Sequence, residues 1–219
     1  MQGKLIVIEG LDSSGKETQS RMLEEHFKKE GVNCRRVEFP NYKSESSTLV
    51  KMYLRGDFGS NASDVNPYAA SSFYAVDRYA SYKTGFEDFY KNGGLVIADR
   101  YTTSNMIHQA SKLESGKDEF AEWIMNYEYE LLGLPRPDKV IFLNMPTDVA
   151  VKLMQNRINK ATGEEKKDIH EKDIAYLKAT YAEAMRLAKK LGWSVVNCSD
   201  GENPRDILEI HEDILGVLK

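Results

Sequence analysis

Residues 10–18, GLDSSGKET, place two glycines and a lysine at the spacing of a phosphate-binding loop. The pattern is Gly10, four residues, then Gly15 and Lys16. Glycines let successive backbone N–H groups turn toward phosphate oxygens, and a lysine neutralises charge on a phosphoryl group in transfer. An apolar run precedes the loop and a helical pattern follows it, which is the context such a loop requires. We therefore expect a nucleotide phosphate to bind here, beside Lys16.

Two acidic residues in this loop need separate explanations. The residue after the lysine is usually Ser or Thr, but here it is Glu17, and the hydroxyl follows one residue later on Thr18. Glu17 could face solvent in the first helical turn, ligate magnesium, or weaken metal binding by repulsion. We favour the solvent-facing position because Thr18 can still donate to a phosphate. Asp12 is electrostatically costly inside a phosphate loop unless it holds a metal ion or a sugar hydroxyl, which favours a reaction beside the loop.

A second candidate for phosphate handling follows the apolar run at 94–99. Asp99 and Arg100 come at its end, and ligands of open α/β sheets bind at the carboxyl ends of the strands. Arg100 offers a planar fork to a phosphate, and Asp99 could orient it or reach a metal ion through water. The same two residues also fit a plain ion pair at a strand end.

A further arginine lies in the helical stretch FYAVDR. Arg78 follows Phe73 and Tyr74 in that stretch. Aromatic rings beside an arginine fit an ordinary boundary between core and surface. They also fit a face that stacks on a nucleotide base and donates a hydrogen bond to a base carbonyl.

The elements that must position these residues alternate between strand and helix. Apolar runs rich in β-branched residues predict strands at 4–10, 34–39, 94–99, 139–144 and 193–198. Helical patterns separate them at 18–31, 67–94, 147–160 and 173–192. Most of the strands are nearly continuous apolar runs, which is typical of parallel strands covered on both faces. We predict one α/β domain over 1–219, with a central five-stranded parallel sheet between two helical layers, as in P-loop NTPases.

Composition narrows the class of protein further. The chain has 219 residues, 41% of them hydrophobic, and a net charge of −4, which argues against a dedicated nucleic-acid binder. Cys34 and Cys198 are too few for a disulfide framework and are predicted to be buried thiols. With neither a signal-peptide pattern nor an apolar run of membrane-spanning length, we expect a cytoplasmic protein without a membrane partner.

The order of short motifs resembles the thymidylate kinase family, over nearly the whole chain. The motifs are IEGLDSSGKETQ, EFPNY, FYAVDR, DRYTTSN, LGLPRPDKVIFL and a charged segment that contains DIHE. A phosphate loop alone is widespread, but the later motifs in this order are much more specific. The resemblance implies a homodimeric enzyme that uses ATP and Mg²⁺ to phosphorylate dTMP, giving dTDP and ADP.

The resemblance also implies a role for each matching residue. The residues that would bind ATP are Gly10, Ser13, Ser14, Gly15, Lys16, Glu17 and Thr18. Those that would contact dTMP are Phe39, Pro40, Tyr42, Tyr74, Arg78, Arg100, Ser104, Asn105, His108, Asp168 and Glu171. Asp99 and Thr18 would belong to the magnesium network. The catalytic groups would be Asp12, Lys16, Arg100 and Arg157, the last at the start of a lid over about 156–172.

Some features of the chain leave alternatives open. The charged stretch 160–173 fits either a mobile lid or a solvated loop, and His108 stands where many members of the family have Tyr or Phe. Tyr74 stands where Phe is common, so another nucleoside monophosphate or a deoxynucleoside could be the acceptor. Glu17 would be the main feature in favour of a non-catalytic nucleotide-binding module.

Overall fold

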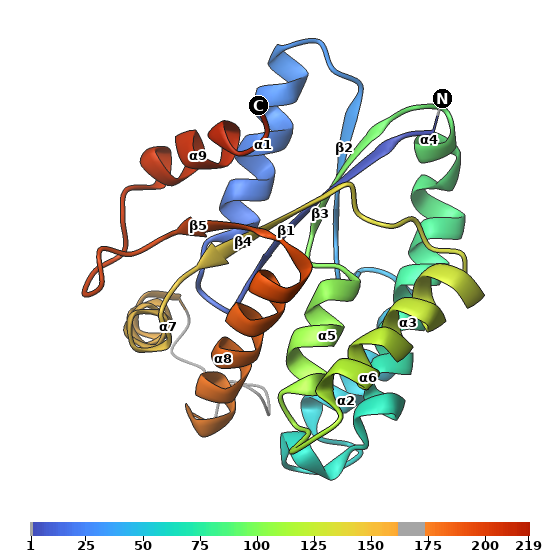
Figure 1. Cartoon of the computed structure of the whole chain (residues 1–219), viewed down its shortest axis with the longest axis vertical. Helices are drawn as coiled ribbons and strands as arrows, with labels where there is room; N and C mark the ends of the chain where they lie inside the picture. Colours follow the sequence, from blue (N-terminus) through green and yellow to red (C-terminus); the bar gives the residue numbers. More distant parts are fainter. Residues whose placement is uncertain (1, 162–173) are drawn as a thin grey trace.

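The computed structural model describes residues 2–161 and 174–219, with side chains omitted at 62 and 155–161. Its centre is a parallel sheet of β1 (Lys4–Gly10), β2 (Cys34–Glu38), β3 (Leu95–Asp99), β4 (Lys139–Asn144) and β5 (Ser194–Asn197). The strand order across the sheet is β2-β3-β1-β4-β5. Each predicted strand is therefore confirmed, with bounds that differ by at most a residue at either end, and the sheet is flanked by helices on both sides (Figure 1).

The two faces of the sheet explain why its strands are nearly all apolar. Leu5 and Val7 of β1 pack into one core with helices α5 (Thr102–Ala110) and α6 (Lys117–Met125). Ile6 and Ile8 pack into the other core with α1 (Lys16–Lys29) and α9 (Ile207–Gly216). Successive side chains of a strand point to opposite faces, so a strand covered on both sides has no polar face to alternate with.

The helices form two layers over these cores (Figure 1). One layer contains α1 (Lys16–Lys29), α7 (Thr147–Ala161) and α9 (Ile207–Gly216). The other contains α3 (Pro67–Ser81), α4 (Glu87–Lys91), α5 (Thr102–Ala110), α6 (Lys117–Met125) and α8 (Ile174–Leu191). The short helix α2 (Thr48–Arg55) packs against α3, with η1 (Glu45–Ser47) before it and η2 (Ala62–Asp64) after it.

Two wide helical turns interrupt this second layer. A π-helix, η3 (Tyr82–Phe86), joins α3 to α4, so the helix expected over 67–94 is continuous in direction but not in hydrogen bonding. A second π-helix, η4 (Asn126–Leu131), follows α6 directly. Wide turns of this type are rare and occur frequently at functional sites.

The carboxyl ends of β1, β2 and β3 meet at one edge of the sheet. Ile8 of β1 and Glu38 of β2 both lie opposite Asp99 of β3. The segments that follow these strands therefore start side by side, and they carry the phosphate loop, Phe39 and Arg100. This edge is where the topology of a doubly wound sheet places a ligand.

Both cysteines are buried and unbridged, as predicted. Burial raises the pKa of the Cys198 thiol to about 12 and also raises the pKa of Cys34. No helix in the described part of the chain is long and apolar enough to cross a membrane.

Candidate active site

The phosphate loop is a tight turn between β1 and α1, and its close contacts explain its glycines. A Cβ at Gly10 would lie 2.5 Å from the Ser14 hydroxyl and 3.1 Å from the carbonyl of Leu143. Gly15 has φ of 88° at the N-cap of α1, a left-handed conformation that glycine adopts without strain, and Ser13 has φ of 60°. The Ser14 hydroxyl is buried without a hydrogen-bond partner in the described residues. The loop thus holds a polar group that a ligand can satisfy.

Lys16 is the first residue of α1, two residues before the predicted start of that helix. Its side chain is nearly covered, at 7% exposed, and Nζ donates to the Leu11 carbonyl at 2.7 Å. Burial, assisted by the charge of Arg100, lowers the pKa of Lys16 to about 8. A phosphate at the loop would supply the negative charge that this buried ammonium group lacks.

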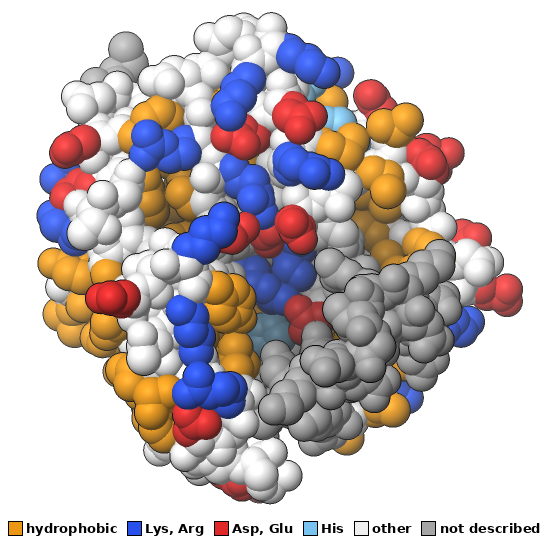
Figure 2. Space-filling view, turned by 180° about the vertical axis from the view of Figure 1, so that it is seen from behind, with side chains coloured by type: hydrophobic (Ala, Val, Ile, Leu, Met, Phe, Trp, Pro, Cys, Tyr) orange, Lys and Arg blue, Asp and Glu red, His pale blue; other side chains and the backbone are white. Residues whose placement is uncertain are grey.

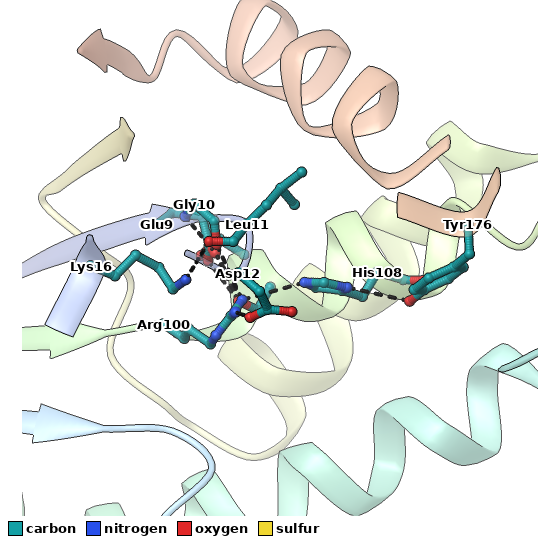
Figure 3. A network of polar contacts seen from close by, with 10 residues as sticks. Glu9, Gly10, Leu11, Asp12, Lys16, Arg100, His108 and Tyr176 are labelled. Atoms are coloured by element: carbon teal, nitrogen blue, oxygen red, sulfur yellow. Dashed lines mark hydrogen bonds and ion pairs between the residues drawn. The ribbon is translucent and has the colours of Figure 1, made fainter. Parts of the chain in front are cut away.

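Arg100 and Asp12 meet in front of the loop from different strands (Figure 3). Arg100 has φ of 63°, and this left-handed backbone at the end of β3 turns its side chain toward the loop. Its Nη2 donates to Asp12, and Nη1 lies 3.2 Å from the Gly10 carbonyl and 3.3 Å from Ser104 Oγ. Burial alone would lower the pKa of Arg100, but the carboxylates of Asp12, Glu9 and Asp99 raise it above its ordinary value.

Glu9 is a site residue that sequence reasoning missed. Its carboxylate is fully buried at the end of β1, where it accepts from Thr103 Oγ1 at 2.6 Å and from Ser104 Oγ at 2.8 Å. Arg100 Nη1 lies 3.8 Å away. An acidic residue inside an apolar strand, as in the motif IEG, was the signal that could have revealed it. Glu9 fixes the start of α5 against the loop and adds negative charge behind Arg100.

The oxygen donors near the loop suit a magnesium ion that arrives with a nucleotide. Thr18 is half-buried in the first turn of α1, and the Asp99 carboxylate lies 3.0 Å from Arg36 Nη2. No group of three or more His, Cys, Asp or Glu side chains in the described part of the chain could hold a metal ion alone. Mg²⁺ usually keeps several waters and binds through one or two carboxylates together with substrate phosphates. The donor set therefore fits a nucleotide-borne ion rather than a permanently caged one.

Glu17, next to Lys16, differs from these groups in its exposure to solvent. It is exposed in the first turn of α1, where a carboxylate interacts favourably with the helix dipole. The structure thus agrees with the solvent-facing position that we favoured for it.

The residues expected at the base form a buried cluster between α3 and α5. Arg78 is only 2% exposed and makes two hydrogen bonds to Glu128, at 2.6 and 2.5 Å. Asn105 is 3% exposed and also donates to Glu128, at 3.0 Å. Glu128 lies in η4 and was missed because nothing in the stretch NYEYELL distinguishes it from a surface acid.

The four aromatic and proline positions expected at the substrate lie in different environments. Phe39 is 5% exposed and packs on the rings of Tyr101 and Phe86, and a cis peptide bond links it to half-buried Pro40. Tyr42 is 51% exposed. Tyr74 is half-buried and packs edge-to-face on Tyr53, with ring centroids 6.3 Å apart. Their contacts with a substrate stay predictions.

His108 connects Arg100 to the beginning of α8 (Figure 3). Its Nε2 lies 3.3 Å from Arg100 Nη1, and its Nδ1 lies 3.3 Å from the Tyr176 hydroxyl. Because an arginine can only donate, Nε2 must be the acceptor, so the proton is on Nδ1 and the ring is neutral in this arrangement. The hydroxyl of Tyr176 in turn donates to the His108 carbonyl at 3.1 Å.

For the remaining predicted residues, the structure describes no side chain, so their predicted roles stay predictions. Arg157 falls in α7 without a described side chain, and Asp168 and Glu171 fall outside the described residues.

In the described part, the face opposite to that of Figure 1 has a hollow bordered by basic side chains, with acidic and histidine side chains inside it (Figure 2).

Comparisons with known proteins find relatives that match this chain over most of its length. Thymidylate kinase of Mycobacterium tuberculosis (strain CDC 1551 / Oshkosh) is 31% identical over 191 residues, covering 86% of this chain and 87% of the relative. Thymidylate kinase of Plasmodium falciparum (isolate 3D7) is 29% identical over 214 residues, 98% of this chain and 89% of the relative. A solved thymidylate kinase from Candida albicans shares the fold, with a TM-score of 0.68 at 19% identity over 99% of this chain and 91% of that one.

The chain also matches the family as a whole over most of its length. A model of the family described as thymidylate kinase covers residues 8–214, from the end of β1 to α9. It thus includes both the phosphate loop and the buried cluster around Glu128. This chain belongs to the thymidylate kinase family.

Proposed function

We propose that this protein transfers the γ-phosphoryl group of ATP to dTMP, forming dTDP and ADP. The observation that carries the proposal is the convergence of Lys16, Asp12 and Arg100 at one edge of the sheet. A phosphate loop alone would hold a nucleotide. Arg100, which comes from the end of a different strand, meets the loop carboxylate of Asp12, and together they provide a place for a second, acceptor phosphate.

The phosphate groups would replace contacts that the protein now makes with itself. Lys16 would leave the Leu11 carbonyl and bind the β- and γ-phosphates, with the N–H groups of the loop and the Ser14 hydroxyl around them. Arg100 would hold the acceptor phosphate with its planar fork, and Asp12 would keep Arg100 in place or bind the sugar 3′-hydroxyl. Positioning and charge neutralisation would supply the rate, because phosphoryl transfer needs no covalent enzyme intermediate.

Mg²⁺, when bound, would neutralise charge on the phosphate oxygens of ATP. Thr18, in the first turn of α1, and Asp99, at the end of β3, would contact the ion or its waters. Glu17 is exposed and does not weaken the case for catalysis.

Two wider features of the proposal rest on the family alone. A lid over about 156–172 would close over the nucleotides. Arg157 would lie at its start, and Asp168 and Glu171 near its end. A homodimer would use the helical layer that contains α3. Among the aromatic residues of this layer, Tyr82 and Phe86 are buried in the core, whereas Tyr79 is 40% exposed and would be available to an interface.

An assay of ADP release tests the proposal. The purified protein is incubated with ATP and Mg²⁺ and, in turn, dTMP, dUMP, UMP, dCMP, dGMP, AMP or thymidine. We expect dTMP to give the highest kcat/KM. A different best acceptor would keep the mechanism and replace the substrate. Folded protein that binds ATP but releases no ADP with any acceptor would contradict the proposed function.

A further inference from the structure

Glu128 is a fully enclosed carboxylate with no part in binding phosphate. Its side chain is 0% exposed, and it lies on the wide turn η4 rather than on a regular helix. Such turns occur frequently at functional sites. Burying a charge costs free energy unless hydrogen bonds satisfy it. The hydrogen-bond partners of Glu128 therefore indicate its role.

Four donor groups converge on the two oxygens of this carboxylate. Arg78 donates from Nε to Oε2 at 2.6 Å and from Nη2 to Oε1 at 2.5 Å. Thr102 Oγ1 donates to Oε2 at 2.7 Å, and Asn105 Nδ2 donates to Oε1 at 3.0 Å. Because Arg78 and Asn105 share Oε1, their side chains lie next to each other at a fixed spacing.

These contacts fix the orientation of the Asn105 amide. Its two N–H groups have two acceptors, Glu128 Oε1 at 3.0 Å and the Ser71 carbonyl at 3.1 Å. A turned amide would aim its oxygen at two other oxygens, so only the present orientation is satisfied. Within residues 2–161 and 174–219, no group donates a hydrogen bond to Asn105 Oδ1. This oxygen is also not fully enclosed, so a ligand can reach it. Asn105 therefore presents an acceptor.

By the same reasoning, Arg78 has, among the described residues, a free hydrogen-bond donor where Asn105 has a free acceptor. Glu128 takes Nε and Nη2, and no acceptor in the described part of the chain reaches Nη1. A guanidinium group can only donate. Arg78 therefore presents a donor beside the acceptor of Asn105.

We propose that Glu128 is a positioning residue that sets the base selectivity of this kinase, because it locks Asn105 as an acceptor beside Arg78 as a donor. This pattern complements the 2,4-dioxopyrimidine edge of thymine and uracil, which offers a carbonyl acceptor at O4 and an N–H donor at N3. Cytosine reverses both groups, with a donor at N4 and an acceptor at N3, and is rejected. The inference rests on the proposed function and extends it to a residue that touches no substrate.

The test compares wild-type protein with Glu128→Gln in the ADP-release assay, with dTMP, dUMP and dCMP as acceptors. A glutamine accepts at only one of the two oxygen positions, so either Arg78 loses a contact or the Asn105 amide turns. We expect the KM for dTMP to rise by about 10-fold or more, while the KM for ATP stays unchanged. The ratio of kcat/KM for dTMP over dCMP should fall by about 10-fold or more.

The matched control is Glu183→Gln. Glu183 is 2% exposed and also holds an arginine through two hydrogen bonds, from Arg186 at 3.0 and 2.8 Å. It should lower stability without changing the dTMP-to-dCMP ratio. A folded Glu128→Gln protein with the wild-type ratio would overturn the inference, as would wild-type protein that uses dCMP as well as dTMP while phosphoryl transfer itself is intact.

A second measurement needs no variant. In ¹⁵N-labelled wild-type protein without ligand, both side-chain N–H protons of Asn105 should exchange with solvent at least about 100-fold more slowly than those of an exposed asparagine. Exposed Asn92 provides the reference in the same spectrum. Fast exchange at Asn105 would overturn the inference even if Glu128→Gln fails to fold. Absence of turnover with every nucleotide would instead refute the proposed function, and the amide measurement would then decide the orientation by itself.

Discussion

The two ends of the site each hold an arginine against a carboxylate, but under different conditions. At the phosphate end, the side chains of Arg100 and Asp12 are 17% and 32% exposed. At the base end, those of Arg78 and Glu128 are 2% and 0% exposed. Arg100 also shares its donors among the Gly10 carbonyl, Ser104 and His108, whereas Arg78 gives two of its nitrogens to one partner.

This difference separates two uses of the same chemical pair. A pair that water reaches is weakly held, so a substrate phosphate can take the place of its carboxylate. An enclosed pair is costly to break and stays as it is while the substrate comes and goes. The phosphate end is thus built to exchange partners, and the base end is built to present a fixed pattern of donors and acceptors.

The largest expected effect belongs to the phosphate end. Lys16→Ala removes the buried cation from the loop, and we expect kcat to fall by about 1,000-fold or more, since charge stabilisation supplies most of the rate. ADP release with saturating ATP and dTMP measures it. Lys29→Ala, at an exposed position on the same helix, should retain normal activity. Near wild-type turnover of Lys16→Ala would refute the mechanism.

The second prediction contrasts the two pairs in stability. Glu128→Gln should lower the free energy of unfolding by about 3–5 kcal/mol, because it leaves Arg78 buried without its counter-charge. Asp12→Asn should lower it by less than about 1 kcal/mol, since that pair is partly hydrated, while activity falls strongly. Urea denaturation at pH 7 gives both values. Equal losses in the two variants would show that the pairs do not differ as described.

The third prediction concerns the proton on Lys16. The pKa of about 8 in the ligand-free protein means that roughly half of the Lys16 side chains are neutral at pH 8. The phosphates of ATP favour the charged form and raise this pKa, so binding at pH 8 should take up about half a proton. Calorimetry in two buffers of different ionisation enthalpy detects the uptake. Lys16→Met should show none, and equal proton uptake by that variant would assign it to another group.

The smallest effect is expected at Glu17. Glu17→Ser restores the hydroxyl that phosphate loops usually carry after the lysine, but the side chain it replaces is exposed. We expect kcat/KM for ATP to change by less than about threefold. A larger gain at low Mg²⁺ concentration would show that this position does take part in metal binding.

The fold was predictable because its determinants are local. Most strands are nearly continuous apolar runs, the loop motif lies between one strand and one helix, and Arg100 directly follows a strand. Strand ends converge at one edge by topology alone, so the meeting of Arg100 with the phosphate loop could be anticipated without knowing any distance.

Glu9 and Glu128 are harder to predict, because their roles depend on partners far away in the sequence. The apolar strand around Glu9 marks this acid as unusual but does not show its partners. Glu9 is bound by Thr103, 94 positions away, and Glu128 by Arg78, 50 positions away. In the stretch NYEYELL, the sequence does not show that Glu128 is buried. The π-helix that carries Glu128 has no sequence signature either, since it differs from the preceding helix only in hydrogen bonding.

The two buried cysteines have a practical consequence for such experiments. Thiolates are the reactive form, and burial keeps both native thiols protonated at neutral pH. A cysteine introduced at an exposed position such as Leu208, which is 66% exposed on α9, would therefore be the preferred target of a maleimide dye. The wild-type chain can thus serve directly as the background for fluorescence reporters, without removal of Cys34 or Cys198.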